Sequence, residues 1–292
     1  MPERKRVNVA KGTVPQEGRK PKLGQHFLVG EPAALRIVEA LGNFSDATVL
    51  EIGPGRGALT ALLAARGRRI IAVELDRVLA AQLRMKFATY SNVEIIEGDI
   101  LKIKLDTVFG PKPGTLRPGL NFAPEPAYVV GNLPYYITSD ILLRLLEYHR
   151  YFSTIVIMVQ KEVADRLAAS PGSRDYGLLS ATAQLYARVE KLFTLPPGAF
   201  SPPPKVHSSV VRLTIEPRLD SLRVPEAEFI SFLRLSFGQK RKTLWNNLKT
   251  QYDQEALRAA LAKSGVKPTV RAEALPLTKS AALFRALQDG SR

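Results

Sequence analysis

The residues with the clearest chemical potential form the run Asn132-Leu133-Pro134-Tyr135. The asparagine offers a side-chain oxygen that accepts hydrogen bonds, the residue before the rigid proline exposes a backbone carbonyl, and the tyrosine offers an aromatic plane. Two acceptors beside a flat ring suit the exocyclic amine of a planar base. Because turns of this kind also occur in ordinary connecting loops, the four residues alone leave the function open.

A glycine-rich turn at residues 51–58 offers a place for a second ligand. Glycines let the backbone turn sharply and approach a ligand without a clash from Cβ. Glu74 follows Gly53 by 21 residues, and a carboxylate at that spacing can accept from both hydroxyls of a ribose. Asp99 ends the next apolar stretch and can accept from an adenine amine. Solvated carboxylates are the alternative for either acid alone, but together with the turn they favour ligand binding.

Two cofactor classes compete for this turn. Gly53, Gly55 and Ala58 satisfy the G-x-G-x-x-G/A pattern of a dinucleotide site. Pro54 and Gly57 instead give the E-x-G-x-G-x-G form that is usual in S-adenosylmethionine sites. An acid after each of the two following strands also suits a nucleoside without a pyrophosphate. We therefore favour S-adenosylmethionine over NAD.

The motifs follow predicted strands, and helical patterns separate those strands. Apolar stretches predict strands at Thr48–Ile52, Arg69–Glu74, Val93–Glu97, Ala127–Gly131 and Thr154–Val159. Helices are expected at residues 31–41, 58–66, 77–87, 141–148, 161–169 and 178–186. This alternation predicts an α/β fold with a parallel, doubly wound, Rossmann-like sheet, whose ligands bind at the carboxyl ends of the strands.

The last third of the chain lacks the alternation of strands and helices. Arg188–Leu195 and Ser208–Ile215 predict a final hairpin, and from Val224 the pattern is purely helical. We expect a disordered basic arm at 1–22, a Rossmann-like α/β domain at 23–217 and a small all-helical domain at 218–292. The Pro/Gly-rich stretch 110–126 is expected to be a surface loop.

The positive charge gathers at the two ends. The chain has 292 residues and a net charge of +15. Residues 1–22 contribute +5 and residues 218–292 contribute +7, whereas the long middle contributes only +3. This distribution indicates a polyanionic partner gripped by the flanks. Lys240, Arg241 and Lys242 lead a predicted helix, and phosphate contact is favoured there over a solvated face.

Several classes of function are excluded by composition. The chain has no cysteine and three histidines, none at metal-ligand spacing, so we expect no metal site. No apolar run approaches about 20 residues, so no membrane helix is expected. The basic N-terminus lacks the apolar segment of a signal peptide. A cytoplasmic protein is the expectation.

These motifs together resemble one family. The chain is similar to the small-subunit (16S) rRNA adenine N6,N6-dimethyltransferases over roughly residues 22–290. The matching segments are residues 23–28, 51–57, 73–76, 98–99, 131–135 and 160–163, and, most specifically, Phe200-Ser201-Pro202-Pro203-Pro204-Lys205-Val206 and Phe237-Gly238-Gln239-Lys240-Arg241-Lys242-Thr243-Leu244.

The resemblance implies a fold, a reaction and a set of residues. It implies a Rossmann-like methyltransferase domain with a helical C-terminal domain, acting as a monomer on small-subunit rRNA or a 30S-type particle. The reaction moves four methyl groups onto two adjacent adenosines near the 3′ end of that rRNA. Carried over by position, S-adenosylmethionine binding falls on His26, Leu28, Gly53, Glu74, Asp99 and Asn132, and Gly55 belongs to the same turn.

The mechanism that follows is a hypothesis. The Asn132 side-chain oxygen and the Leu133 carbonyl would accept the two N6 hydrogens, with Pro134 holding the turn. Tyr135 would stack on the target base, and Phe200 would close its other face. Phe200 as ordinary hairpin packing and Tyr135 as a core aromatic are the alternatives. His26 and Tyr136 stand where many members of the family have Asn.

Other readings remain open. The nearest is a large-subunit (23S) rRNA adenine N6-methyltransferase of the macrolide-resistance type, and a mitochondrial transcription-factor relative is a more distant one. A non-catalytic RNA-binding assembly factor and an NAD-dependent oxidoreductase come from different classes. The intact run 132–135 argues against a purely inert scaffold.

Overall fold

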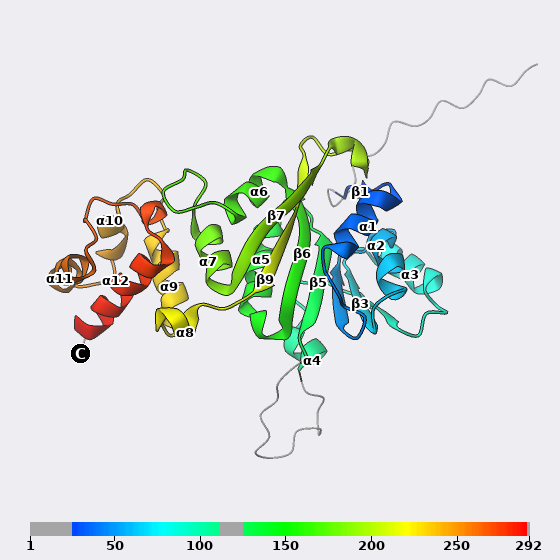
Figure 1. The fold of residues 1–292 in the computed structure, drawn as a ribbon, viewed down its shortest axis with the longest axis horizontal. Coiled ribbons are helices and arrows are strands. Elements are labelled where there is room, and N and C mark those ends of the chain that lie inside the picture. Colours follow the sequence, from blue (N-terminus) through cyan, green and yellow to red (C-terminus); the bar gives the residue numbers. More distant parts are fainter. Residues whose placement is uncertain (1–24, 111–124, 291–292) are drawn as a thin grey trace, which may run out of the picture.

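A seven-stranded sheet lies at the centre of the computed structural model, which describes residues 25–110 and 125–290 (Figure 1). Its strand order is β4-β3-β2-β5-β6-β9-β7. Strands β4 to β6 run parallel, whereas β9 and β7 are antiparallel additions. The bounds are β2 (Thr48–Ile52), β3 (Arg69–Glu74), β4 (Val93–Glu97), β5 (Ala127–Asn132), β6 (Phe152–Gln160), β7 (Ala187–Leu195) and β9 (Ser208–Ile215).

Both faces of the parallel part are covered by helices because alternate residues of its strands are apolar on either side. Val49, Val130 and Val156 pack with α1 (Glu31–Glu39) and α2 (Ala58–Ala64) on one face. Leu50 and Val129 join the larger core on the other face, with α5 (Thr138–Glu147) and α7 (Leu178–Tyr186). A parallel sheet buried on both faces is typical of α/β folds.

Shorter helices complete this part of the chain. Helix α3 (Arg77–Lys86) begins at Asp76, whose Oδ1 accepts from the backbone N–H groups of Val78 (2.8 Å) and Leu79 (3.2 Å), as an N-cap does. Helix α6 (Lys161–Leu167) follows β6 directly, and α4 (Leu105–Phe109) follows β4. The 3₁₀ turns are η1 (His149–Tyr151), η2 (Pro197–Ala199) and η3 (Ala272–Ala274).

After β9 the described chain is helical and lies to one side of the sheet, from yellow to red in Figure 1. Phe229 and Phe284 are buried at its centre, with ring centroids 5.4 Å apart. The same apolar cluster continues into the sheet's larger core. The helices are α8 (Leu219–Leu222), α9 (Glu226–Ser236), α10 (Leu244–Leu248), α11 (Gln254–Ser264) and α12 (Leu277–Gly290).

The predicted strands, the alternation of strands and helices, and the antiparallel pair β7–β9 are confirmed. The sequence did not predict α4 or the short strands β1 (Phe27–Leu28) and β8 (Phe200–Ser201), which pair antiparallel. Two-residue strands have no periodicity to detect, and here a distant partner creates them. The expected arm at 1–22 and most of the 110–126 loop lie outside the described residues. No helix in the described chain is long and apolar enough to cross a membrane.

Candidate active site

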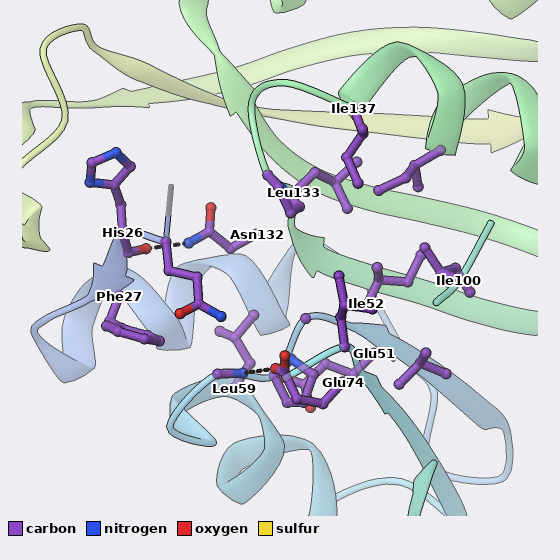
Figure 2. A pocket seen from close by; sticks show the side chains of 18 of the residues that line it. His26, Phe27, Glu51, Ile52, Leu59, Glu74, Ile100, Asn132, Leu133 and Ile137 are labelled. Atoms are coloured by element: carbon purple, nitrogen blue, oxygen red, sulfur yellow. Dashed lines mark hydrogen bonds between the residues drawn. The ribbon is translucent and has the colours of Figure 1, made fainter. Parts of the chain in front are cut away.

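A cavity opens at the carboxyl ends of β2, β3 and β5 (Figure 2). Its space is about 1090 Å³ when the open solvent at its mouth is included. The cavity brings together every residue predicted to bind the cofactor and four of the five predicted for chemistry: His26, Leu28, Gly53, Gly55, Glu74, Asp99, Asn132, Leu133, Pro134 and Tyr135.

The glycine turn forms the floor where the backbone must come close to a ligand. Gly53, Gly55 and Gly57 have φ values of 67°, 59° and 78°, which side-chain-bearing residues rarely adopt. A Cβ on Gly55 would lie 2.9 Å from the ring of Phe27, itself part of the cavity wall. Only glycine therefore allows this turn and this wall to coexist.

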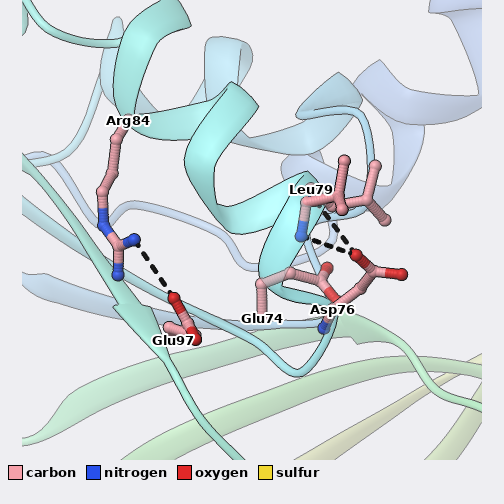
Figure 3. A network of polar contacts seen from close by, with 6 residues as sticks. Glu74, Asp76, Leu79, Arg84 and Glu97 are labelled. Atoms are coloured by element: carbon pink, nitrogen blue, oxygen red, sulfur yellow. Dashed lines mark hydrogen bonds and ion pairs between the residues drawn. The ribbon is translucent and has the colours of Figure 1, made fainter.

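Glu74 is a buried carboxylate held by two backbone donors. Its Oε2 accepts from the N–H of Gly55 at 3.0 Å, and its Oε1 accepts from the N–H of Asp76 at 2.9 Å. The residue is only 3% exposed. Figure 3 shows Glu74 beside Asp76, where β3 passes into α3. Because each carboxylate oxygen can accept more than one hydrogen bond, Glu74 is positioned to receive a pair of ligand hydroxyls.

Asp99 lies one strand further along the same edge. Its Oδ1 accepts from the N–H of Leu101 at 3.0 Å, which fixes the side chain in the turn after β4. Lys102 approaches the other oxygen at 3.9 Å. Asp99 and Glu74 therefore place two acidic groups on one wall of the cavity, as the spacing of the strands predicted.

Glu51 is a cavity residue that we did not single out from the sequence, although it is the first letter of the motif. It is 1% exposed, and Thr60 Oγ1 donates a hydrogen bond of 2.7 Å to its Oε2. Burial raises the pKa of Glu51 from 4.5 to about 7, and the nearby charge of Glu74 also raises it. Near neutral pH this carboxyl is partly protonated, unlike a solvated one.

Asn132 is held in one orientation. Its Nδ2 donates a hydrogen bond of 2.8 Å to the backbone carbonyl of His26 (Figure 2). Because a carbonyl can only accept, this contact fixes which end of the amide is nitrogen. The Oδ1 is then the end left to accept from a ligand.

The backbone carbonyls of Leu133 and Pro134 have different roles. In the described part of the chain, the Leu133 carbonyl accepts no hydrogen bond. The Pro134 carbonyl accepts from Thr138 Oγ1 at 2.9 Å and so helps to start α5. The turn therefore offers the Leu133 carbonyl as an acceptor and uses the Pro134 carbonyl for its own support.

Tyr135 is fixed from two sides. Its hydroxyl lies 2.6 Å from Ser208 Oγ, and its ring stacks on His26 with centroids 5.6 Å apart and planes at 28°. Burial raises the pKa of the Tyr135 phenol above its ordinary value, so the hydroxyl stays protonated. His26 Nδ1 lies 2.7 Å from the Pro202 carbonyl; since that carbonyl only accepts, Nδ1 carries the hydrogen.

Phe200 is the predicted residue that the structure does not bring to the cavity. It is 3% exposed, pairs with Leu28 across β1 and β8, and packs in the core with Val210. This matches the alternative of hairpin packing. Stacking of Phe200 on a base stays a prediction, and it would require the ring to leave that packing.

The three predicted RNA-binding cations lie away from the cavity, in the exposed loop between α9 and α10. Lys240 Nζ donates a hydrogen bond of 2.7 Å to the Arg174 carbonyl in another loop. Arg241 and Lys242 form no salt bridge among the described residues. They directly precede Thr243, which caps α10 by accepting from the N–H of Asn246.

The remaining wall fits a nucleoside cofactor. Apolar side chains surround the acids and the glycine turn, among them Ile52, Leu59, Leu75 and Ile100. A mostly apolar pocket with a few converging polar groups is the usual form of such a site. No group of three or more His, Asp or Glu that could hold a metal occurs in residues 25–110 and 125–290. The other lining residues that we did not predict include Gln25, Arg56, Tyr136, Ile137 and Ile141.

Comparison with known proteins shows to which family the chain belongs. A family model described as ribosomal RNA adenine dimethylase matches residues 17–289. The chain belongs to this family. The ribosomal RNA small subunit methyltransferase A of Koribacter versatilis is 60% identical over 93% of this chain and 95% of the relative. The protein of the same name from Acidobacterium capsulatum is 56% identical over 93% and 92%.

Two solved methyltransferase structures superpose on this chain. A dimethyladenosine transferase from Plasmodium falciparum superposes with a TM-score of 0.73 at 25% identity, covering 91% of this chain and 98% of that one. The 23S rRNA methyltransferase ErmE superposes with a TM-score of 0.64 at 28% identity, covering 90% and 99%. The predicted Rossmann-like methyltransferase fold is confirmed.

Proposed function

We propose that this dimethylase transfers methyl groups from S-adenosylmethionine to N6 of two adjacent adenosines near the 3′ end of small-subunit rRNA. The chain is an S-adenosylmethionine-dependent rRNA adenine dimethyltransferase. The observation that carries the assignment to adenine N6 is the acceptor pair of the 132–135 turn. Asn132 Oδ1 is oriented by the Nδ2 bond to His26, and the Leu133 carbonyl next to it accepts no hydrogen bond from residues 25–110 or 125–290.

The residues that would hold the cofactor are those of the cavity floor and acidic wall. Glu74 would accept from the ribose, Asp99 from the adenine amine, and the 53–57 turn would approach the chain without Cβ clashes. When bound, the cofactor supplies a methyl group made electrophilic by the attached sulfonium. Every other part of the reaction falls to side chains and backbone groups of this chain.

The acceptor pair solves the main chemical difficulty. Adenine N6 is a weak nucleophile because its lone pair is delocalised into the ring. If Asn132 Oδ1 and the Leu133 carbonyl accept the two N6 hydrogens, the nitrogen can pyramidalise and aim its lone pair. Fixed acceptors of this kind stabilise charge that develops in the transition state, and one of them is worth about 3 kcal/mol. The departing proton can leave to water, so no strong base is required.

The flat face of the target base needs a platform as well. Tyr135 lines the cavity with its hydroxyl held by Ser208 and one ring face covered by His26. Its other face would stack on the base, a contact worth about 1–3 kcal/mol. Such stacking compensates for removing the nucleotide from its neighbours.

The substrate-level assignments extend this reading. We assign residues 23–217 to the methyltransferase domain and 218–292 to an RNA-binding helical domain, with Arg241 and Lys242 contacting phosphates beside Lys240. The partner would be a small ribosomal subunit or its precursor. The enzyme would act as a cytoplasmic monomer and would also take part in ribosome biogenesis. The identity of 56–60% to small-subunit methyltransferases, against 28% to ErmE, supports small-subunit over large-subunit rRNA.

The decisive experiment is transfer of labelled methyl groups to small subunits that lack these methylations. We expect N6,N6-dimethyladenosine at two adjacent positions, located by primer extension. Large subunits serve as the matched control substrate. Labelling of 23S rRNA with unlabelled small subunits would overturn the assignment, and a titration with NAD in parallel would expose a dinucleotide enzyme.

A further inference from the structure

Three loops from distant parts of the sequence meet where the loop after α6 contacts the C-terminal helical part. We call residues 170–175, 238–243 and 266–271 the junction loops. Lys240 Nζ donates to the Arg174 carbonyl at 2.7 Å, which ties the second loop to the first. The N–H of Leu244, the residue directly after the second loop, donates to the Val270 carbonyl of the third loop at 2.7 Å. The N–H of Gly172 also donates to the Glu273 carbonyl at 2.7 Å.

The junction loops concentrate positive charge. They contain six lysines and arginines and a single acid, Asp175. All six cations are exposed: Arg174, Lys240, Arg241, Lys242, Lys267 and Arg271. Arg271 approaches Glu273 at 3.7 Å.

The charge of the other junction cations is not neutralised. Among the described residues, Arg174, Arg241, Lys242 and Lys267 form no salt bridge, although many of the chain's other cations do. Uncompensated like charges held together by backbone contacts repel each other, so the arrangement favours an anionic ligand.

Lys240 has a structural task within this surface. Its ammonium group holds the Arg174 carbonyl, so it links the loop after α6 to the helical part of the chain. The Arg174 side chain is then presented by a backbone that Lys240 fixes. The lysine that the sequence assigned to phosphate contact therefore acts first as a positioning residue for an arginine 66 positions away.

The surface faces the same edge of the molecule as the cavity. Helix α6 starts directly after β6, at the carboxyl end of the strands, and the first junction loop follows α6. In Figure 1 this loop extends from α6 toward the helices around α10, along the edge where β1 also lies. A nucleic acid with one base in the cavity can therefore continue along this edge onto the junction loops.

We propose that the junction loops form one composite phosphate-binding surface, with Arg174, Arg241, Lys242 and Lys267 contacting the backbone of an rRNA helix while an adenosine occupies the cavity. The proposal rests on the proposed function and deepens it. It adds a methyltransferase-side arginine and a second helical-side loop to the predicted cations, and it reassigns Lys240. Phosphate contacts would set the register of the RNA without reading its sequence.

The test is the salt dependence of binding to an rRNA fragment that contains the two adjacent adenosines. Each phosphate contact contributes about 0.7–0.9 to the slope of log affinity against log salt concentration. We expect Arg174→Gln, Arg241→Gln, Lys242→Gln and Lys267→Gln each to lower the slope by about that amount. Arg66→Gln is the matched control, because Arg66 is exposed, forms no salt bridge with any residue that the structure describes, and follows α2 at the opposite edge of the sheet.

The role of Lys240 is tested by a double-mutant cycle. Lys240→Met keeps the aliphatic stem and removes the donor to the Arg174 carbonyl. We expect Arg174→Gln to weaken RNA binding less in the Lys240→Met background than in the wild type, because the arginine is no longer held in place. Fully additive effects would show that Lys240 does not position Arg174.

Two results separate this inference from the proposed function. If the wild-type enzyme methylates small subunits and the four variants keep the wild-type salt slope, the composite surface is wrong and the function stands. If the slopes fall as expected but no methylation occurs on small subunits, the surface stands and the substrate assignment fails.

Discussion

The proposed function gives Asn132 two separable tasks, one for each end of its amide. Nδ2 anchors the side chain to the His26 carbonyl, and Oδ1 would accept from adenine N6. We expect Asn132→Ala to lower the rate of methyl transfer by at least about 100-fold, corresponding to the loss of about 3 kcal/mol of transition-state stabilisation. Affinity for rRNA should change little. Single-turnover transfer and filter binding measure the two effects.

The matched variant for Asn132 is Asp, which keeps the acceptor oxygen and replaces the donor nitrogen with a second acceptor oxygen. Its carboxylate would face the His26 carbonyl across what is now a 2.8 Å hydrogen bond, so the side chain should turn away. We expect Asn132→Asp to be impaired as well, because orientation and acceptance are both needed. Robust transfer by Asn132→Ala would remove this residue from the chemistry.

Glu51 should make the stability of the protein depend on pH in an unusual direction. Its folded pKa of about 7 exceeds the unfolded value of 4.5. Between these values the folded state binds more protons, so stability is fully present below pH 4.5 and is lost as the pH rises through 7. The difference corresponds to about 3 kcal/mol.

The variant Glu51→Gln is neutral at every pH and so isolates this effect. From below pH 4.5 to above pH 7, the free energy of unfolding of the wild type should fall by about 3 kcal/mol relative to Glu51→Gln. Denaturant titrations of both proteins at each pH measure it. Parallel curves would mean that Glu51 ionises normally despite its burial.

At the scale of residues, the sequence predicted the site residues whose chemical type and spacing form a recognisable pattern. Glu74 and Asp99 could be predicted because Glu74 ends β3 and Asp99 lies just after β4, and parallel strands bring their carboxyl ends to one edge. Glu51 was overlooked because its pKa depends on burial by side chains that are distant in sequence. The place of Phe200 in the core could not be settled, since the pairing of β1 with β8 decides it.

At the scale of elements, the strand–turn–helix unit β2–α2 depends on the left-handed backbone of its glycines. Gly55 has φ 59°, and a Cβ there would lie 2.9 Å from the Phe27 ring. We expect Gly55→Ala to destabilise the fold by about 1–2 kcal/mol through backbone conformation alone. Displacement of Phe27 should also weaken S-adenosylmethionine binding by about tenfold or more, which calorimetric titration would measure.

The control for the turn is Gly198→Ala, in η2. Gly198 has no positive φ, and a Cβ there would meet nothing within 4 Å. This variant should bind the cofactor as the wild type does. If Gly55→Ala matched it in both stability and affinity, the close approach of the turn to its ligand would lose its support.

The elements themselves were largely predictable because burial on both sheet faces leaves continuous apolar strands between amphipathic helices. The β1–β8 pair was not, because each strand has only two residues and neither has a pattern of its own. Yet this pair carries His26 and Leu28 to the cavity, and the N–H of Val29 donates to the Ala199 carbonyl at 2.8 Å to support it. The part of the site that the sequence pattern did not predict is therefore the part that tertiary contacts between β1 and β8 form.

At the scale of the whole molecule, the helical part and the sheet share one apolar core. The cluster runs from Val129 in β5 to Phe284 in α12 without interruption. Polar contacts cross the same boundary: Tyr186 donates to Glu226 Oε1 at 2.7 Å, and Arg234 pairs with Glu147 at 3.3 Å. A boundary near residue 217 is visible in the sequence pattern, but the extent of this shared packing depends on side chains that meet only in the fold.

The shared core predicts that the two parts unfold together. Trp245 is the chain's one tryptophan and lies in α10 of the helical part, so its fluorescence reports on that part alone. Far-UV circular dichroism reports on all helices and strands. Because separating the parts would expose the common core, we expect the two signals to give coincident denaturant transitions, the mark of a two-state process. A Trp245 transition at clearly lower denaturant would instead indicate a helical domain that unfolds independently, with a boundary that is energetic as well as compositional.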